Sequence, residues 1–194
     1  KGLGDPTPYG IMGPSMIGYF TPFEEWPEEV KEMWRYDPAE AERLLDEAGF
    51  PRGADGIRFK TDVYFAEWFG YMDLDLTQIV KTYWAAIGVD VGIKMLDNPA
   101  LRAAQNGHTY KHITVCLRAQ SYTSAIWWQA HSESEWNVPG LNDPEYDAMV
   151  DVANAATTVE EFKRLVKEIN MYLLKQKICA MVDRLPVFNV WQPW

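Results

Sequence analysis

The feature that most constrains this chain is a strand–helix–strand pattern between residues 57 and 95. Apolar and polar side chains alternate over 57–65 and again over 89–95, which is typical of strands with one buried face. Between them, residues 71–87 carry apolar side chains at helical spacing, and Gly88 ends that helix. Because such a connection within one sheet is nearly always a right-handed crossover, the pattern predicts two parallel strands covered by a helix.

Other helices are marked by the residues that cap their first turns. Asp37 before Pro38, and Asp143 before Pro144, each place a carboxylate beside the free backbone amides of a helix start. Gly49 follows the first of these helices, over 37–48, as a left-handed C-cap. We also expect a short helix over 28–34, a helix over 98–106 with Asn98 as its cap, a strand near 111–118, a long helix capped by Thr158 and an extended segment over 184–191.

The first 35 residues differ from the rest of the chain in composition. Gly and Pro recur throughout 1–35, with aromatic and aliphatic residues between them, and such a stretch cannot hold long regular elements. We therefore predict an irregular arm over 1–35 that packs on an α/β lobe formed by residues 36–194.

Charge and composition exclude several classes of function. The net charge of −10 disfavours nucleic acids and anionic membranes as partners, because both repel an acidic protein. No apolar run approaches the ~20 residues that span a bilayer. The chain starts at Lys1 without an initiating Met or a secretion signal, so we interpret it as a mature product or an excised piece.

Candidate catalytic and metal-binding residues are few. Cys116 and Cys179 lack metal or redox spacing and are interpreted as buried small side chains, with a disulfide between them as the alternative. His108 and His112 straddle a predicted helix–strand junction and have no third ligand nearby. Since no nucleophile motif is present either, we predict no enzyme, no metal site and no cofactor.

The best candidate site is the aromatic loop over 119–136, which follows the third predicted strand. Ligands of open α/β sheets collect at the carboxyl ends of strands. This region offers a cation, amide groups that both donate and accept, and flat apolar rings, and the alternative is that two of its Trp rings only anchor the loop. The candidate ligand-binding residues are Arg118, Gln120, Tyr122, Trp127, Trp128 and Gln129.

Several segments resemble one protein family in sequence and in order. The stretch Tyr36-Asp-Pro-Ala-Glu-Ala-Glu-Arg-Leu-Leu-Asp-Glu-Ala-Gly-Phe50 resembles a helix of the family 5 extracellular solute-binding proteins. These are the oligopeptide-, dipeptide- and nickel-binding components of ABC importers. The core Ala-Ile-Gly-Val-Asp-Val over 86–91 and the stretch Asn-Asp-Pro-Glu-Tyr-Asp over 142–147 are similar to later family segments.

The resemblance implies the fold and setting of the protein. It implies a periplasmic-binding-protein type II-like α/β lobe, with a mixed sheet flanked by helices, corresponding to the carboxy-terminal lobe of a longer two-lobed protein. The implied partners are a small solute or short peptide, an ABC permease and the missing amino-terminal lobe, with no nucleic acid. The implied location is periplasmic or extracellular, and a lipid anchor in the full-length protein is compatible with the family.

The resemblance leaves the ligand and one alternative function open. Peptide-binding members carry an Asp in the loop after the third strand, whereas residues 118–131 contain no Asp or Glu, so that role is not transferred. A sugar ring or a ligand with a carboxylate suits the same Trp, Gln and Arg residues. The alternative function is a ligand-sensing domain of a cytoplasmic transcriptional regulator. An α/β enzyme is a third reading, which requires a converging catalytic site in the structure.

Overall fold

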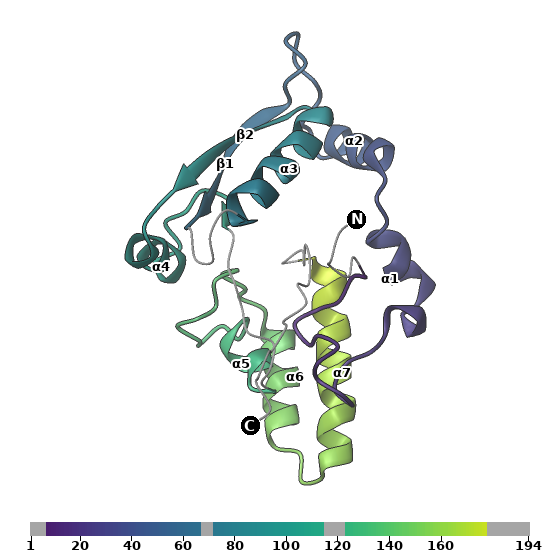
Figure 1. Cartoon of the computed structure of the whole chain (residues 1–194). Coiled ribbons are helices and arrows are strands. Elements are labelled where there is room, and N and C mark those ends of the chain that lie inside the picture. The colour runs from purple at the N-terminus through teal and green to yellow at the C-terminus, as the bar shows by residue number, and fades with distance from the viewer. Residues whose placement is uncertain (1–6, 67–71, 115–122, 178–194) are drawn as a thin grey trace, which may run out of the picture. The chain divides into compact units, whose positions relative to one another are not determined.

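The computed structural model describes residues 7–66, 72–114 and 123–177 (Figure 1). The chain divides into two compact units, and each is described by itself. The sheet unit comprises Tyr36–Arg118, and the terminal unit comprises Lys1–Arg35 together with Ala119–Trp194. The division into an arm over 1–35 and a lobe over 36–194 stays a prediction.

The sheet unit is built on three parallel strands in the order β2–β1–β3. β1 (Phe59–Phe65) pairs with β2 (Val89–Met95) from Phe59 opposite Val89 to Phe65 opposite Met95. The end of β1 also pairs with β3 (Ile113–Thr114). The parallel pairing of the two alternating strands is thus confirmed, while residues 115–118 of the third predicted strand lie outside the described residues.

The alternation in β1 and β2 separates a buried face of the sheet from a polar one. On the buried face Val63, Val89 and Val91 form a cluster against Trp84 near the end of α3 (Met72–Ala86). The opposite face carries charges that pair across the strands, as in the 3.6 Å contact between the Lys60 ammonium and the Asp90 carboxylate. The helix between the two strands therefore covers the apolar side, as the spacing predicts.

The cap of α4 (Asn98–Asn106) differs from the prediction by one residue. The carboxylate of Asp97 accepts a hydrogen bond from the backbone N–H of Ala100 at 2.7 Å, so Asp97 and not Asn98 is the N-cap. Asn98 and Pro99 then occupy the first turn. Both Asp and Asn are strong capping residues, and two such residues in succession leave the start of a helix ambiguous in sequence.

The caps predicted for α2 (Pro38–Glu47) are present. The Asp37 carboxylate accepts from the backbone N–H of Glu40 at 3.0 Å. At the other end Gly49 has a φ of +86°, and the N–H of Phe50 donates to the carbonyl of Leu45, which closes the helix in a Schellman motif. However, no residue of α2 is fully buried, so its apolar stripe alone does not fix its position.

Two arginines fasten α2 to the sheet unit. The Arg58 side chain is only 2% exposed, forms ion pairs with Glu42, at 3.0 Å, and Asp46 on α2, and donates to the Ile87 carbonyl at 2.9 Å. Arg52 also pairs with Glu42 and donates to a carbonyl at the end of α3. We call this set of contacts, centred on Arg58, the arginine clamp. In the alternating pattern of 57–65, Arg58 is one of the polar residues between the apolar ones, so its burial is a finding of the structure.

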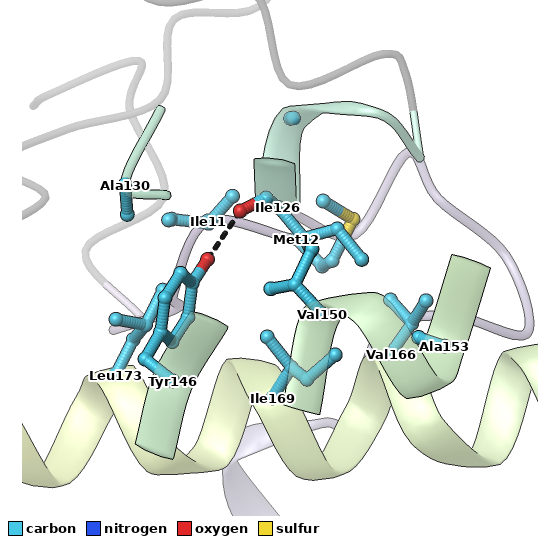
Figure 2. Packing of buried hydrophobic residues seen from close by; sticks show 11 residues of the cluster. Ile11, Met12, Ile126, Ala130, Tyr146, Val150, Ala153, Val166, Ile169 and Leu173 are labelled. Atoms are coloured by element: carbon cyan, nitrogen blue, oxygen red, sulfur yellow. Dashed lines mark hydrogen bonds between the residues drawn. The ribbon is translucent and has the colours of Figure 1, made fainter. Parts of the chain in front are cut away.

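The terminal unit is mainly helical. It contains a 3-10 turn, η1 (Phe23–Glu25), α1 (Glu28–Met33) and α5 (Ala125–Trp128), together with the longer helices α6 (Pro144–Asn154) and α7 (Val159–Gln176). Figure 1 shows α6 and α7 side by side, and their facing side chains form the core drawn in Figure 2. Asp143 caps α6 and Thr158 caps α7, as the sequence predicts.

The amino-terminal arm adds its own residues to this core. Ile11 and Met12 are fully buried against the α6–α7 pair. The backbone N–H of Met12 donates at 3.0 Å to the side-chain oxygen of Asn170, a buried residue of α7. Gly10 lies against the same amide, because a Cβ added there would be 2.2 Å from the Asn170 Oδ1. The Asn170 amide therefore binds the arm, and the lack of a side chain at Gly10 lets the arm approach it closely.

We expect Gly10→Ala to destabilise the protein. The added methyl group forces the Asn170 amide to move and removes the acceptor of the Met12 N–H, and overpacking of this kind costs ~1–3 kcal/mol. Chemical denaturation measures the loss of unfolding free energy. An unchanged free energy would show that the arm does not hold this position in solution.

The arginine clamp predicts a specific dependence of stability on pH. Hydrogen bonds from Arg52 and then Arg58 hold the pKa of Glu42 below its ordinary value of 4.5. The stabilisation from a depressed carboxyl pKa is present above that ordinary value and is lost as the pH falls through the folded-state pKa. We therefore expect the stability difference between the native protein and Glu42→Gln to shrink below about pH 4.5.

The measurement is thermal unfolding of both proteins from neutral pH to pH 3. Glu47→Gln is the matched control, because the ion pair of Glu47 within the described residues is with Arg43 of its own helix and not with the clamp. A stability difference for Glu42→Gln that stays constant over the whole range would contradict the clamp.

Candidate functional site

The structure describes half of the predicted site residues. Arg118, Gln120 and Tyr122 lie outside the described residues. Trp127 and Trp128 end the short helix α5, and Gln129 is its C-cap. The structure thus places these three on one helical turn of the terminal unit, where neighbouring residues face different directions.

Trp127 presents its ring at the surface. The residue is 37% exposed, and its indole stacks on the imidazole of His131 with ring centroids 5.4 Å apart and planes 25° apart. The backbone N–H of His131 donates to the Trp127 carbonyl at 2.9 Å. This continuation of the helical turn brings the two rings, four residues apart, onto the same face.

Trp128 is turned toward the protein interior. Its ring packs against the core of the terminal unit and meets the ring of Trp136 edge-on, with centroids 6.3 Å apart. The Trp128 carbonyl accepts from the Ser134 hydroxyl at 2.6 Å. The anchoring role considered for the Trp residues therefore fits Trp128, whereas Trp127 offers a surface.

Gln129 carries a hydrogen-bond donor that nothing in the described part of the chain satisfies. The residue is 6% exposed, and its side-chain Nε2 has no hydrogen-bond partner there. A buried amide without a partner is costly, because it has lost water without replacing it. Such a group is suited to donate to a carbonyl or hydroxyl oxygen of a ligand.

His131 lies beneath Trp127 and beside two carboxylates. Its Nδ1 accepts from the backbone N–H of Glu133 at 3.2 Å. Its Nε2 lies 3.8 Å from one carboxylate oxygen of Asp147 and equally far from one of Asp151, both on α6. Over the described residues, no group of three or more His, Cys, Asp or Glu side chains is arranged to hold a metal ion.

The core below α5 fixes the turn that carries these rings. Tyr146 of α6 is completely buried, and its hydroxyl donates to the carbonyl of Ile126 in α5 (Figure 2). After the turn, Asp147 accepts from both the backbone N–H and the hydroxyl of Ser132. Two adjacent residues of α6, Tyr146 and Asp147, thus hold the chain before and after Trp128.

The start of α6 is itself tied to α7. The hydroxyl of Tyr172 donates to the Asp143 carboxylate at 2.7 Å, while that carboxylate also accepts from the first backbone amides of α6. The hydrogen bond from Tyr172 lowers the pKa of Asp143, and the same bond raises the pKa of Tyr172 to about 12. The α6–α7 pair that carries the candidate site is therefore apolar in its core and held by charged hydrogen bonds at the start of α6.

Sequence reasoning missed His131, Asp147 and Tyr146 as parts of this arrangement. The spacing of His131 from Trp127 is a helical signal, but it appears only if the loop is assumed to contain a helical turn. The partners of Asp147 and Tyr146 are 15 and 20 residues away in sequence, and no local pattern points to them.

We expect Tyr146→Phe to destabilise the terminal unit by ~1–3 kcal/mol, because the buried Ile126 carbonyl loses its donor while the ring remains. Chemical denaturation measures this loss. Tyr172→Phe is the matched control, and we expect a smaller effect because the Asp143 carboxylate retains its backbone donors. An equal or larger loss for Tyr172→Phe would show that the buried hydroxyl does not hold α5.

Comparison with solved structures shows the same fold in longer proteins. OppA of Haemophilus influenzae, in complex with the peptide RPPGFSPFR, superposes with a TM-score of 0.70 at 17% identity over 91% of this chain and 34% of its own. CtaP of Listeria monocytogenes, an ABC transporter substrate-binding protein, gives 0.75 at 15% identity over 93% and 34%. DppA of Helicobacter pylori, in complex with the peptide STSA, gives 0.67 at 17% identity over 93% and 33%.

These structures establish the α/β fold, and the chain spans about a third of their length. The predicted resemblance to a part of a periplasmic binding protein is thus confirmed. Comparison with curated protein sequences gives no significant match. None of the helices in the described ranges has the length and apolarity that crossing a membrane requires.

The family is shown by the sequence itself. A family model described as bacterial extracellular solute-binding proteins, family 5 middle, matches residues 1–137, which is well over half of the 194 residues. The family is a class of binding proteins, so the prediction that the chain is not an enzyme is confirmed. The chain belongs to the family 5 bacterial extracellular solute-binding proteins.

Proposed function

We propose that the chain forms part of the binding component of an ABC importer and contributes Trp127 and Gln129 to the site for a short peptide. The carrying observation is that Trp127 presents an exposed ring on a turn fixed from the core. Family membership supports the importer over the alternative, a sensor domain of a cytoplasmic regulator, because the family description is extracellular. The solute is captured outside the cytoplasmic membrane and passed to a permease.

The chemistry of α5 supports a peptide as the ligand class. A peptide offers carbonyl oxygens to the Gln129 Nε2, which has no partner among the described residues, and side chains that pack on an indole face. Two of the similar proteins, OppA of Haemophilus influenzae and DppA of Helicobacter pylori, are complexes with peptides. The other lobe of the whole protein supplies the opposite wall, and closure of the two lobes is the event that the permease reads.

We expect Trp127→Ala to weaken peptide binding by ~1–3 kcal/mol without unfolding the whole protein that contains this chain. The exposed indole contributes contact area to a ligand and little to the core. Isothermal titration with the peptides STSA and RPPGFSPFR, which the similar structures contain, measures the affinity.

Two variants serve as controls for this measurement. Tyr83→Ala removes an exposed aromatic ring from α3 and leaves peptide affinity unchanged. Trp128→Ala lowers the free energy of unfolding by ~2 kcal/mol or more, because that ring packs on the core. Unchanged affinity for both peptides in Trp127→Ala would move the site elsewhere, and failure of both peptides to bind the native protein would count against this ligand class.

A further inference from the structure

The imidazole of His131 stacks on the exposed ring of Trp127. His131 is 4% exposed and lies four residues after Trp127 on the same helical face, where the two rings form an offset stack. Such pairs prefer centroid separations of 4.5–7 Å, and this pair is at 5.4 Å. One face of the indole is thereby in contact with the imidazole.

The orientation of the imidazole is set by a hydrogen bond at Nδ1. Because the backbone N–H of Glu133 donates to Nδ1, this nitrogen carries no proton, and the neutral ring must carry its proton on Nε2. Nε2 lies 3.8 Å from one carboxylate oxygen of Asp147 and from one of Asp151, too far for a hydrogen bond, and it has no hydrogen-bond partner among the described residues. Turning the ring over places a C–H group opposite the Glu133 N–H, so the observed orientation is the favourable one.

The carboxylate next to Nε2 is itself held in place. Asp147 accepts two hydrogen bonds from Ser132, the residue that follows His131. The backbone of the turn, the imidazole and α6 therefore form one connected set of contacts. Trp127 itself remains exposed at the surface of this set of contacts.

We propose that His131 is a positioning residue of the ligand site, and that its imidazole, as the Nε2–H tautomer, fixes the plane of the Trp127 ring on which the ligand stacks. This inference rests on the proposed function, in which Trp127 contacts the peptide. It also assigns His131 a role other than metal ligation, since a nitrogen that carries a proton has no lone pair for a metal. In this role His131 orders the Trp127 side chain before the ligand binds, so that less conformational entropy is lost on binding.

Two substitutions of His131 separate stacking from hydrogen bonding. His131→Phe keeps a flat ring beneath Trp127 but leaves the Glu133 N–H without its acceptor. His131→Asn keeps an acceptor at the position of Nδ1 but removes the ring. For a positioning role, peptide affinity follows the ring, so His131→Asn weakens binding roughly two- to tenfold while His131→Phe stays close to the native protein. Stability follows the hydrogen bond, so His131→Phe is the less stable of the two.

The tautomer and the stack are tested without a ligand. In 15N NMR spectra of the whole protein, the His131 ring, assigned by its loss in His131→Asn, gives one protonated and one unprotonated nitrogen with the proton on Nε2. The indole N–H signal of Trp127, assigned by its loss in Trp127→Phe, shifts strongly in His131→Asn and little in His131→Phe. Isothermal titration with STSA and RPPGFSPFR and thermal unfolding complete the set.

Each outcome decides one of the two proposals. A proton on Nδ1, or a Trp127 signal that is the same in the native protein and His131→Asn, overturns the positioning role. Equal peptide affinities for His131→Asn and the native protein, together with weaker binding by Trp127→Ala, overturn it as well and leave the proposed function standing. If Trp127→Ala binds both peptides as the native protein does, the proposed function fails, and the role of His131 in ligand binding fails with it.

Discussion

The hydrogen bond from the buried Tyr146 hydroxyl to the Ile126 carbonyl is the contact on which the candidate site depends. α5 is only four residues long, and a helix of that length has no stability of its own in water. Its shape must come from tertiary contacts, and Tyr146 supplies one from the middle of the core. With this turn fixed, its side chains are held in different directions, and Trp127 lies at the surface while Trp128 packs on the core.

The sheet unit solves a similar problem with charge. α2 has good caps at both ends but no fully buried residue, so apolar burial cannot fix its place on the sheet. The Arg58 guanidinium, buried among two carboxylates and two backbone carbonyls, provides the directional contact instead. A planar guanidinium with several donors suits this task because it satisfies a helix and a loop at once, which an ammonium group does with less definite geometry.

The contacts of Tyr146 and Arg58 show why part of the structure could not be predicted from the sequence. The caps at Asp37, Asp143 and Thr158 and the parallel pairing of β1 with β2 depend on neighbours or on a repeating pattern, and they were predicted correctly. The cap of α4 was placed one residue late because two capping residues adjoin. The buried role of Arg58 and the links of α6 to α5 join residues distant in sequence, so no local pattern reports them. For the candidate site, the sequence indicated the aromatic loop but could not tell which Trp faces outward.

The fold of this chain does not determine which ligand it binds. The backbone arrangement is shared with proteins of 15–17% identity at TM-scores of 0.67 to 0.75, so it tolerates replacement of most side chains. A fold that tolerates so much change cannot by itself determine which solute is bound. Side chains that the core orients but does not bury are free to differ between such proteins, and in the terminal unit Trp127 is one of them. His131, which stacks on Trp127, and Gln129 are both buried, and each has a nitrogen that lacks a hydrogen-bond partner among the described residues. Polar groups left in this state are costly in a core, and a binding site is the setting in which that cost has a use.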